Sequence, residues 1–239
     1  FNDVPQPGES GHDTWEGDSW KYTGNISAWA PLSGDSELGH VYVVTDTPTN
    51  DYYGGDRPGQ NLYGTSLIAI VVNTGEIAWH YQMVDDVVWN YDNPNAPKVI
   101  DLVVNGEQIP AVVETTKQGW AYVFNRETGE PVWPIEERPV PQSDVPGERT
   151  APTQPFVTKP PAFELQGVTE DDLIDFTPEL KEQGLKIARQ YRMGPIFTPP
   201  SLADAPDGTN GSFVSPGANG GANIHGRSSN DPETGKHYV

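Results

Sequence analysis

Short apolar stretches separated by turn residues fill the first half of the chain. Those rich in β-branched and aromatic residues predict strands, and they occupy residues 40–44, 66–72, 77–81, 100–104, 109–113 and 121–124. Asn105-Gly106 joins two of them and is a strong signal for a tight hairpin turn. Because no helical pattern separates these strands, we expect antiparallel neighbours and exclude a parallel α/β sheet.

A repeat accompanies the strands. The pattern Thr-Gly-Glu-x-x-Trp occurs at residues 74–79 and again at 128–133, and a third, partial copy covers 231–235. Repeated strand-turn-strand units that end in Trp are typical of β-propeller blades. We therefore expect Trp79 and Trp133 to pack between blades and to take no part in chemistry.

Residues 134–200 interrupt the repeat. The segment is first rich in proline and then acquires a modest helical apolar face. Thr177 followed by Pro178 predicts the start of a helix, and Gly194-Pro195 is expected to end it. We interpret 134–200 as a long insertion packed on a single incomplete propeller domain that covers residues 1–239.

Composition supports an all-β protein and limits the kinds of partner that we expect it to bind. Seven Trp, ten Tyr, 25 Gly and 24 Pro favour a turn-rich, aromatic-rich fold. The net charge of −20 repels phosphate backbones and anionic lipids, so nucleic acid is not an expected partner. There is no cysteine, which excludes thiolate chemistry. The chain starts at Phe1 and stops inside a predicted strand at 236–239, so we expect it to be a fragment of a longer protein.

Candidate chemistry is concentrated at residues 85–94, which are rich in carboxylate and amide oxygens. Hard cations such as calcium prefer these ligands. On composition alone an ordinary polar loop, closed by Asn93-Pro94, is the better explanation. The five histidines show no metal-site spacing, so a zinc site is not expected.

Several segments, in order, resemble the quinoprotein glucose and alcohol dehydrogenases, which depend on pyrroloquinoline quinone (PQQ). They are residues 29–38, 53–62, 89–92, 126–131, 137–141, 152–156 and 196–201. The resemblance implies a partial eight-bladed β-propeller, with fewer than half of its blades in this chain. It also implies a bacterial periplasmic or extracellular enzyme that oxidises an alcohol or aldose sugar and passes electrons to ubiquinone or cytochrome c. Membrane attachment through parts outside this chain stays open.

The same resemblance assigns the cofactor site. The Trp that forms a floor under the quinone matches Trp29, and a cation-ligating Asn of the family is replaced by Thr47, beside Asp46. The cation would be calcium, magnesium or a lanthanide. A Gly-Gly-Ala-Asn stretch that touches the cofactor matches Asn223, although the Trp that follows it in the family is Ile224 here.

The catalytic positions depart from the family. Its general base is the Asp of a Trp-Asp pair, but this chain has Asn90, which cannot accept a proton at neutral pH. Asp92 lies two residues on and would share a cavity with Asn90 in extended chain, so Asp92 is our candidate base, cation ligand or both. Lys117 matches the basic residue that contacts the quinone oxygens and would stabilise the negative charge of the reduced form.

Three hypotheses follow from these residues. In the first, the protein is a PQQ-dependent dehydrogenase whose site has been rearranged; a fragment alone would be inactive. In the second, four departures from the family (Thr47, Asp85, Asn90 and Ile224) mark a propeller that has lost catalysis and binds a ligand or partner. In the third, the propeller is purely structural and binds no quinone. We favour the enzyme, because Trp29, Asp92, Lys117 and Asn223 all remain.

Overall fold

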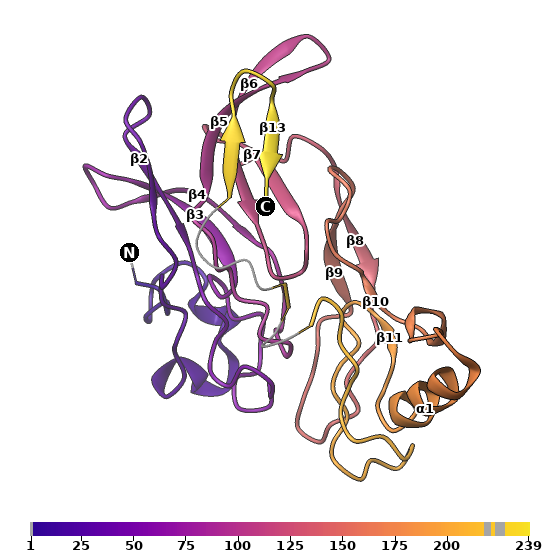
Figure 1. The fold of residues 1–239 in the computed structure, drawn as a ribbon. Coiled ribbons are helices and arrows are strands. Elements are labelled where there is room, and N and C mark those ends of the chain that lie inside the picture. The colour runs from indigo at the N-terminus through magenta and orange to yellow at the C-terminus, as the bar shows by residue number, and fades with distance from the viewer. Residues whose placement is uncertain (1, 218–220, 223–227) are drawn as a thin grey trace.

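The computed structural model describes residues 2–217, 221–222 and 228–239. Its first sheet is antiparallel, with the four strands in sequence order (Figure 1). These strands are β1 (Ser33–Asp35), β2 (His40–Val44), β3 (Ser66–Val71) and β4 (Ile77–Gln82). Two 3₁₀ helices, η1 (His12–Thr14) and η2 (Glu16–Lys21), precede this sheet.

The second sheet is also antiparallel and contains β5 (Lys98–Val104), β6 (Glu107–Thr115) and β7 (Ala121–Asn125). Asn105 and Gly106 connect β5 to β6 with φ values of 54° and 88°. Positive φ at both central residues is what a tight two-residue hairpin needs, and Val104 pairs directly with Glu107. The hairpin predicted from Asn105-Gly106 is therefore confirmed.

Aromatic side chains join the sheets into one core. The Trp79 ring from the first sheet lies 5.8 Å from the Phe124 ring of the second, and the Trp79 indole N–H donates to the backbone oxygen of Arg126 at 3.1 Å. The Trp120 ring, just before β7, in turn lies 5.2 Å from the ring of Phe156. Trp79 thus packs between neighbouring sheets, as the repeat predicts.

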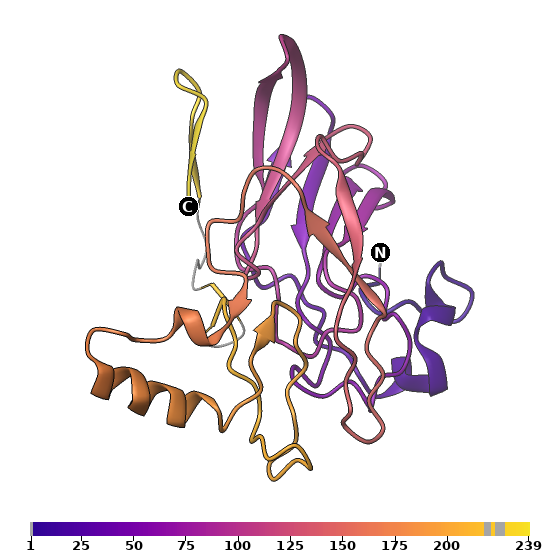
Figure 2. The ribbon, with the colours of Figure 1, turned by 90° about the vertical axis from the view of Figure 1, so that its right-hand side faces the viewer.

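Residues 134–200 carry short strands and one α-helix. Strands β8 (Ile135–Pro139) and β9 (Thr153–Val157) pair with each other, as do β10 (Gly167–Val168) and β11 (Gly194–Pro195). Between β10 and β11 lie η3 (Glu170–Asp172) and α1 (Pro178–Ala188), which projects from the strands (Figure 2). The Thr177 hydroxyl accepts a hydrogen bond from the Leu180 N–H at 3.3 Å, so the predicted start of this helix is confirmed.

The predicted end of the helix is wrong. The helix stops at Ala188, and Gly194-Pro195 instead forms β11, with Pro195 opposite Gly167. Beyond the helix end, the Arg192 N–H donates to the backbone oxygen of Gly211 at 2.8 Å, a long-range bond that a continued helix would prevent.

The third repeat copy forms a hairpin of β12 (Ser229–Asp231) and β13 (Lys236–Tyr238). Strand β12 contacts β5 at the edge of the second sheet. Within the described ranges, helices are too short or too polar to cross a bilayer. The antiparallel sheets confirm the all-β prediction, and the ends of β4 and β6 bring the candidate chemistry together.

Candidate functional site

Lys117 and Asp92 form a buried ion pair at the centre of the candidate site. The Lys117 ammonium donates to the Asp92 carboxylate, and the side chains are only 8% and 6% exposed. Lys117 Nζ also lies 3.5 Å from the backbone oxygen of Asn90. Two segments far apart in the sequence therefore converge here, and Lys117 is not a solvated lysine at the end of a strand.

A tight turn after β6 presents Lys117. The Gly119 N–H donates to the Thr116 oxygen at 2.9 Å, and Gly119 has a φ of 77°, which favours glycine. A later segment closes over this turn, because the Ala222 N–H donates to the Lys117 oxygen at 2.7 Å. The stretch predicted to touch the cofactor thus lies against Lys117, but its predicted contact residue, Asn223, and Ile224 lie outside the described residues.

Asp46 and Thr47 approach the ion pair from the end of β2. Burial, and secondarily the negative charge of Asp92, raise the pKa of Asp46 to about 7. The Asp46 carboxylate accepts from the Thr47 N–H at 2.7 Å. Thr47 is fully buried, and no described residue makes a hydrogen bond to its hydroxyl. A buried hydroxyl without a partner is costly, so it is a candidate ligand for a group that completes the site.

Trp29 lies in the segment before β1 and is 43% exposed. That segment runs beside the Asp46 strand end, because the Asp46 N–H donates to the Ser27 oxygen at 3.1 Å. A partly exposed indole two residues from this contact offers a flat face for stacking. Its alignment with Lys117 and Asp92 stays a prediction.

Asn90 takes a conformation that the sequence did not suggest. Its φ is 55°, so the extended geometry assumed for residues 90–92 is wrong at this residue. The side-chain amide donates to the Tyr52 hydroxyl at 3.4 Å, whereas the Asn90 backbone oxygen faces Lys117. Asn90 and Asp92 therefore meet at Lys117 through a backbone oxygen and a carboxylate, and not through two parallel side chains.

Two buried polar residues of β6 and its turn were missed. Glu114 is fully buried, and burial raises its pKa well above the usual value, against a smaller effect of the Asn95 backbone N–H. The Gln118 amide is also fully buried and has no hydrogen-bond partner among the described residues. The available signal was an acid and an amide within three residues of Lys117, directly after the apolar residues 111–113 of β6.

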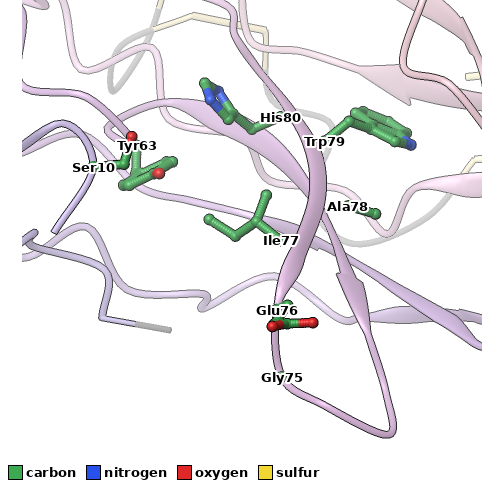
Figure 3. A pocket seen from close by; sticks show the side chains of 8 residues that line it. All are labelled: Ser10, Tyr63, Gly75, Glu76, Ile77, Ala78, Trp79 and His80. Atoms are coloured by element: carbon green, nitrogen blue, oxygen red, sulfur yellow. The ribbon is translucent and has the colours of Figure 1, made fainter.

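The acidic pair that precedes Trp89 lines a neighbouring cavity of ≈ 400 Å³ with Glu16, Gln60 and Arg149. Burial is the main cause that raises the pKa values of Asp85 and Asp86 to about 6. A second hollow, of ≈ 720 Å³, lies along β4 (Figure 3). Its lining includes Tyr63 and His80 but none of the residues of the ion-pair site, so volume alone does not locate the chemistry.

Comparison with known proteins identifies the family. A model of the PQQ glucose/ethanol/alcohol dehydrogenase β-propeller domain matches residues 1–239. The chain is 35% identical over 237 residues to the glycerol dehydrogenase large subunit of Gluconobacter oxydans (strain 621H), covering 98% of this chain and 31% of the relative. It is also 35% identical over 199 residues to the quinoprotein glucose dehydrogenase of Escherichia coli (strain K12), covering 82% of this chain and 25% of the relative.

Solved structures agree on the fold. A europium-containing methanol dehydrogenase superposes with a TM-score of 0.51 at 26% identity, covering 70% of this chain and 29% of that one. A quinohemoprotein alcohol dehydrogenase of Pseudomonas putida HK5 superposes with a TM-score of 0.50 at 24% identity, over 62% and 23% of the two chains. The chain thus spans about a third or less of the length of these proteins, and the prediction of a partial β-propeller is confirmed. The chain belongs to the PQQ glucose/ethanol/alcohol dehydrogenase family, as a segment of its β-propeller domain.

Proposed function

We propose that this chain supplies the PQQ-binding wall of a dehydrogenase that oxidises an alcohol or an aldose sugar. The observation that carries the proposal is the buried Lys117–Asp92 pair. It places an ammonium group and a carboxylate side by side, in a chain that belongs to a family of quinone-dependent enzymes. The relatives' names support the substrate class, since they include glycerol and glucose dehydrogenases.

The residues present fit an anionic, planar cofactor accompanied by a hard cation. Lys117 supplies positive charge, Trp29 supplies an exposed aromatic surface, and the buried Thr47 hydroxyl has an unmet hydrogen-bonding need among the described residues. When bound, the quinone would accept the electron pair that leaves the substrate. The chain's own residues then have to bind, orient and deprotonate the substrate.

Asp92 is the candidate proton acceptor. A carboxylate can take the proton of a substrate hydroxyl only while it is ionised. Asp92 is paired with the Lys117 ammonium in a buried ion pair. Lys117 would also stabilise negative charge that develops on the quinone oxygens. Asn90 cannot take this role, so its backbone oxygen would orient Lys117 while its amide holds Tyr52.

A calcium, magnesium or lanthanide ion would be held by oxygen atoms of Thr47, Asn90 and Asp92. Across the described part of the chain, no group of three or more His, Asp or Glu side chains is arranged to hold a metal. The ion would therefore depend on amide, hydroxyl and cofactor oxygens besides Asp92, which are donors that hard cations accept. The europium in the methanol dehydrogenase neighbour supports including lanthanides.

For the electron acceptor and the location, the proposal relies on what is typical of the family. The electron acceptor would be ubiquinone or cytochrome c, and the location would be periplasmic or extracellular in a bacterium. The net charge of −20 suits neutral alcohols and sugars better than anionic substrates.

The test is quinone binding and dye reduction by the full-length protein, with PQQ, calcium and a panel of alcohols and sugars. We expect stoichiometric quinone binding, substrate-dependent dye reduction, and loss of turnover in Asp92→Ala with quinone binding retained. Binding without turnover in the wild type would support the second hypothesis, a ligand-binding propeller. Failure to bind quinone would overturn the proposed function.

A further inference from the structure

The loop at residues 50–57 lies directly against Asn90. The Asn90 N–H donates to the Asp51 oxygen at 3.2 Å, and the Asn90 amide donates to the Tyr52 hydroxyl at 3.4 Å. Buried Arg57 ties the other end of the loop to the same segment, because its guanidinium donates to the backbone oxygens of Asn50 and Val87. The position of this loop therefore fixes the peptide whose oxygen faces Lys117.

A second loop, residues 143–150, also bonds to the first one. The Gly54 N–H donates to a carboxylate oxygen of Glu148 at 2.9 Å, and the Tyr53 hydroxyl donates to the Pro146 oxygen at 3.1 Å. Gly54 is buried, and a Cβ added there would lie 3.4 Å from Val88 and 3.8 Å from Glu148. The backbone at Gly54 is thus enclosed between Val88, next to the site, and Glu148.

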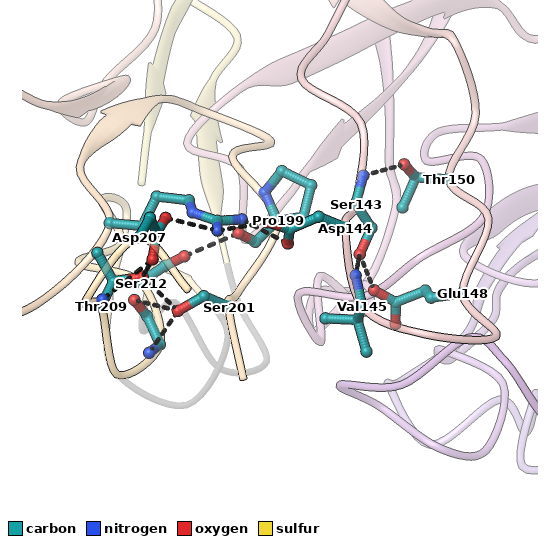
Figure 4. Close-up of polar contacts among 12 residues, drawn as sticks. Ser143, Asp144, Val145, Glu148, Thr150, Pro199, Ser201, Asp207, Thr209 and Ser212 are labelled. Carbon is teal, nitrogen blue, oxygen red and sulfur yellow. Dashed lines mark hydrogen bonds and ion pairs between the residues drawn. The ribbon is translucent and has the colours of Figure 1, made fainter. Parts of the chain in front are cut away.

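The 143–150 loop is itself braced (Figure 4). The second oxygen of Glu148 accepts from the Ser143 hydroxyl, and the Ser143 N–H donates to the Thr150 hydroxyl at 3.1 Å. Asp144 accepts two hydrogen bonds, of 2.9 and 2.8 Å, from the guanidinium of Arg192, which lies between helix α1 and strand β11. Bidentate pairs of this kind are geometrically specific, so the loop is anchored to a second part of the fold.

We propose that Glu148 is a positioning residue for the ion-pair site, which acts by clasping the 50–57 loop against Asn90. Glu148 accepts a hydrogen bond from Gly54 in the 50–57 loop, and Asp51 of the same loop accepts one from Asn90. The backbone oxygen of Asn90 in turn faces Lys117. Its charge contributes as well, because Glu148 is among the acids that favour the charged form of buried Arg57. This inference rests on the proposed function for its effect on turnover, but not for its effect on the loop.

The first readout is amide hydrogen exchange in the full-length apoprotein, which needs no cofactor. Glu148→Ala should speed exchange at Gly54 and its loop neighbours about tenfold or more, as expected when a hydrogen bond to a charged group is lost. Glu148→Gln keeps an acceptor for Gly54 and should change exchange by less than about threefold. Unchanged exchange at Gly54 in Glu148→Ala overturns the clasp, whatever the protein binds.

The second readout is the kinetics of the quinone-loaded enzyme. A displacement of catalytic groups by about 1 Å can lower the reaction rate about a hundredfold. Glu148→Ala should therefore lower kcat at least tenfold, while its quinone content stays that of the wild type. Glu148→Gln should restore most of kcat. Loosened exchange with unchanged kcat overturns the positioning role, and absence of quinone binding in the wild type overturns the proposed function and the kinetic half of this inference together.

The control is Glu170, whose ion pair with Arg189 is exposed on the insertion. Glu170→Ala and Glu170→Gln should leave both readouts at wild-type values. Should Glu148→Ala fail to fold, Tyr53→Phe removes only the bond to Pro146 and should still speed exchange at residues 51–54; no change in that variant would overturn the clasp.

Discussion

The Lys117–Asp92 pair should behave as a buried ion pair in a double-mutant cycle. Both side chains are more than nine-tenths buried, so removing one charge leaves the other desolvated without compensation. Lys117→Met and Asp92→Asn should each lower the free energy of unfolding by about 3–5 kcal/mol, which is roughly a hundredfold to a few thousandfold in the equilibrium constant. The double variant should lose less than the sum, because it buries no unpaired charge.

The cycle is measured by urea unfolding of the full-length apoprotein, with tryptophan fluorescence as the signal and the denaturant slope as a check that the unfolding reaction is unchanged. We expect a coupling energy of about 2 kcal/mol or more. The control pair is Arg138 and Glu136, whose side chains are 48% and 54% exposed and should couple by about 0.2–1 kcal/mol. A coupling energy in the Lys117–Asp92 pair no larger than in this control would show that the two charges do not form a buried ion pair.

Three further predictions concern the fold. Gly129→Ala should lower the free energy of unfolding by about 1–3 kcal/mol more than Gly75→Ala. Both glycines have φ above 70°, but an added Cβ at Gly129 would lie 2.7 Å from the Trp79 indole, whereas one at Gly75 would meet no atom within 4 Å. Equal losses in urea unfolding would contradict this prediction. Asp85 and Asp86 have pKa values of about 6 in the folded state, against 3.8 ordinarily, so the folded protein binds more protons in that window. The free energy of unfolding should then fall as pH rises from about 4 to about 6, and Asp85→Asn/Asp86→Asn should flatten that slope in pH-dependent urea unfolding; an unaltered slope would argue against their burial. Thr177→Ala should destabilise the helix by about 1 kcal/mol through loss of its cap, detectable as faster amide exchange in its first turn, and unchanged exchange would show that the cap is not formed.

Local signals in the sequence predicted the local structure well. Asn105-Gly106 specified its hairpin because only residues that tolerate positive φ fit both turn positions. Thr177-Pro178 specified a helix start because capping depends on the neighbouring few residues. The end of that helix was misjudged: it stops at Ala188, and the backbone beyond it bonds from Arg192 to the distant Gly211, a contact that no local pattern announces.

The candidate site residues were named through family motifs and only in part through physics. Asp92 and Lys117 were named together, and the structure joins them. The turned backbone of Asn90 was missed, since an Asn in the left-handed region looks the same in sequence as one in extended chain. Glu148 was missed as well, because its partner Gly54 is 94 residues away and contacts of that separation leave no periodic trace.

The affinity of the full-length, calcium-loaded apoprotein for PQQ should depend on the charge of Lys117, the lysine at the centre of the candidate site. Titrations should give one quinone per protein for the wild type. Lys117→Met should weaken binding at least about tenfold, as expected when a charge-assisted contact worth 1.5–3 kcal/mol is removed, whereas Lys98→Met on strand β5 should leave the affinity unchanged. Equal quinone affinity in the wild type and Lys117→Met would contradict the claim that this ion pair forms the wall of the cofactor site.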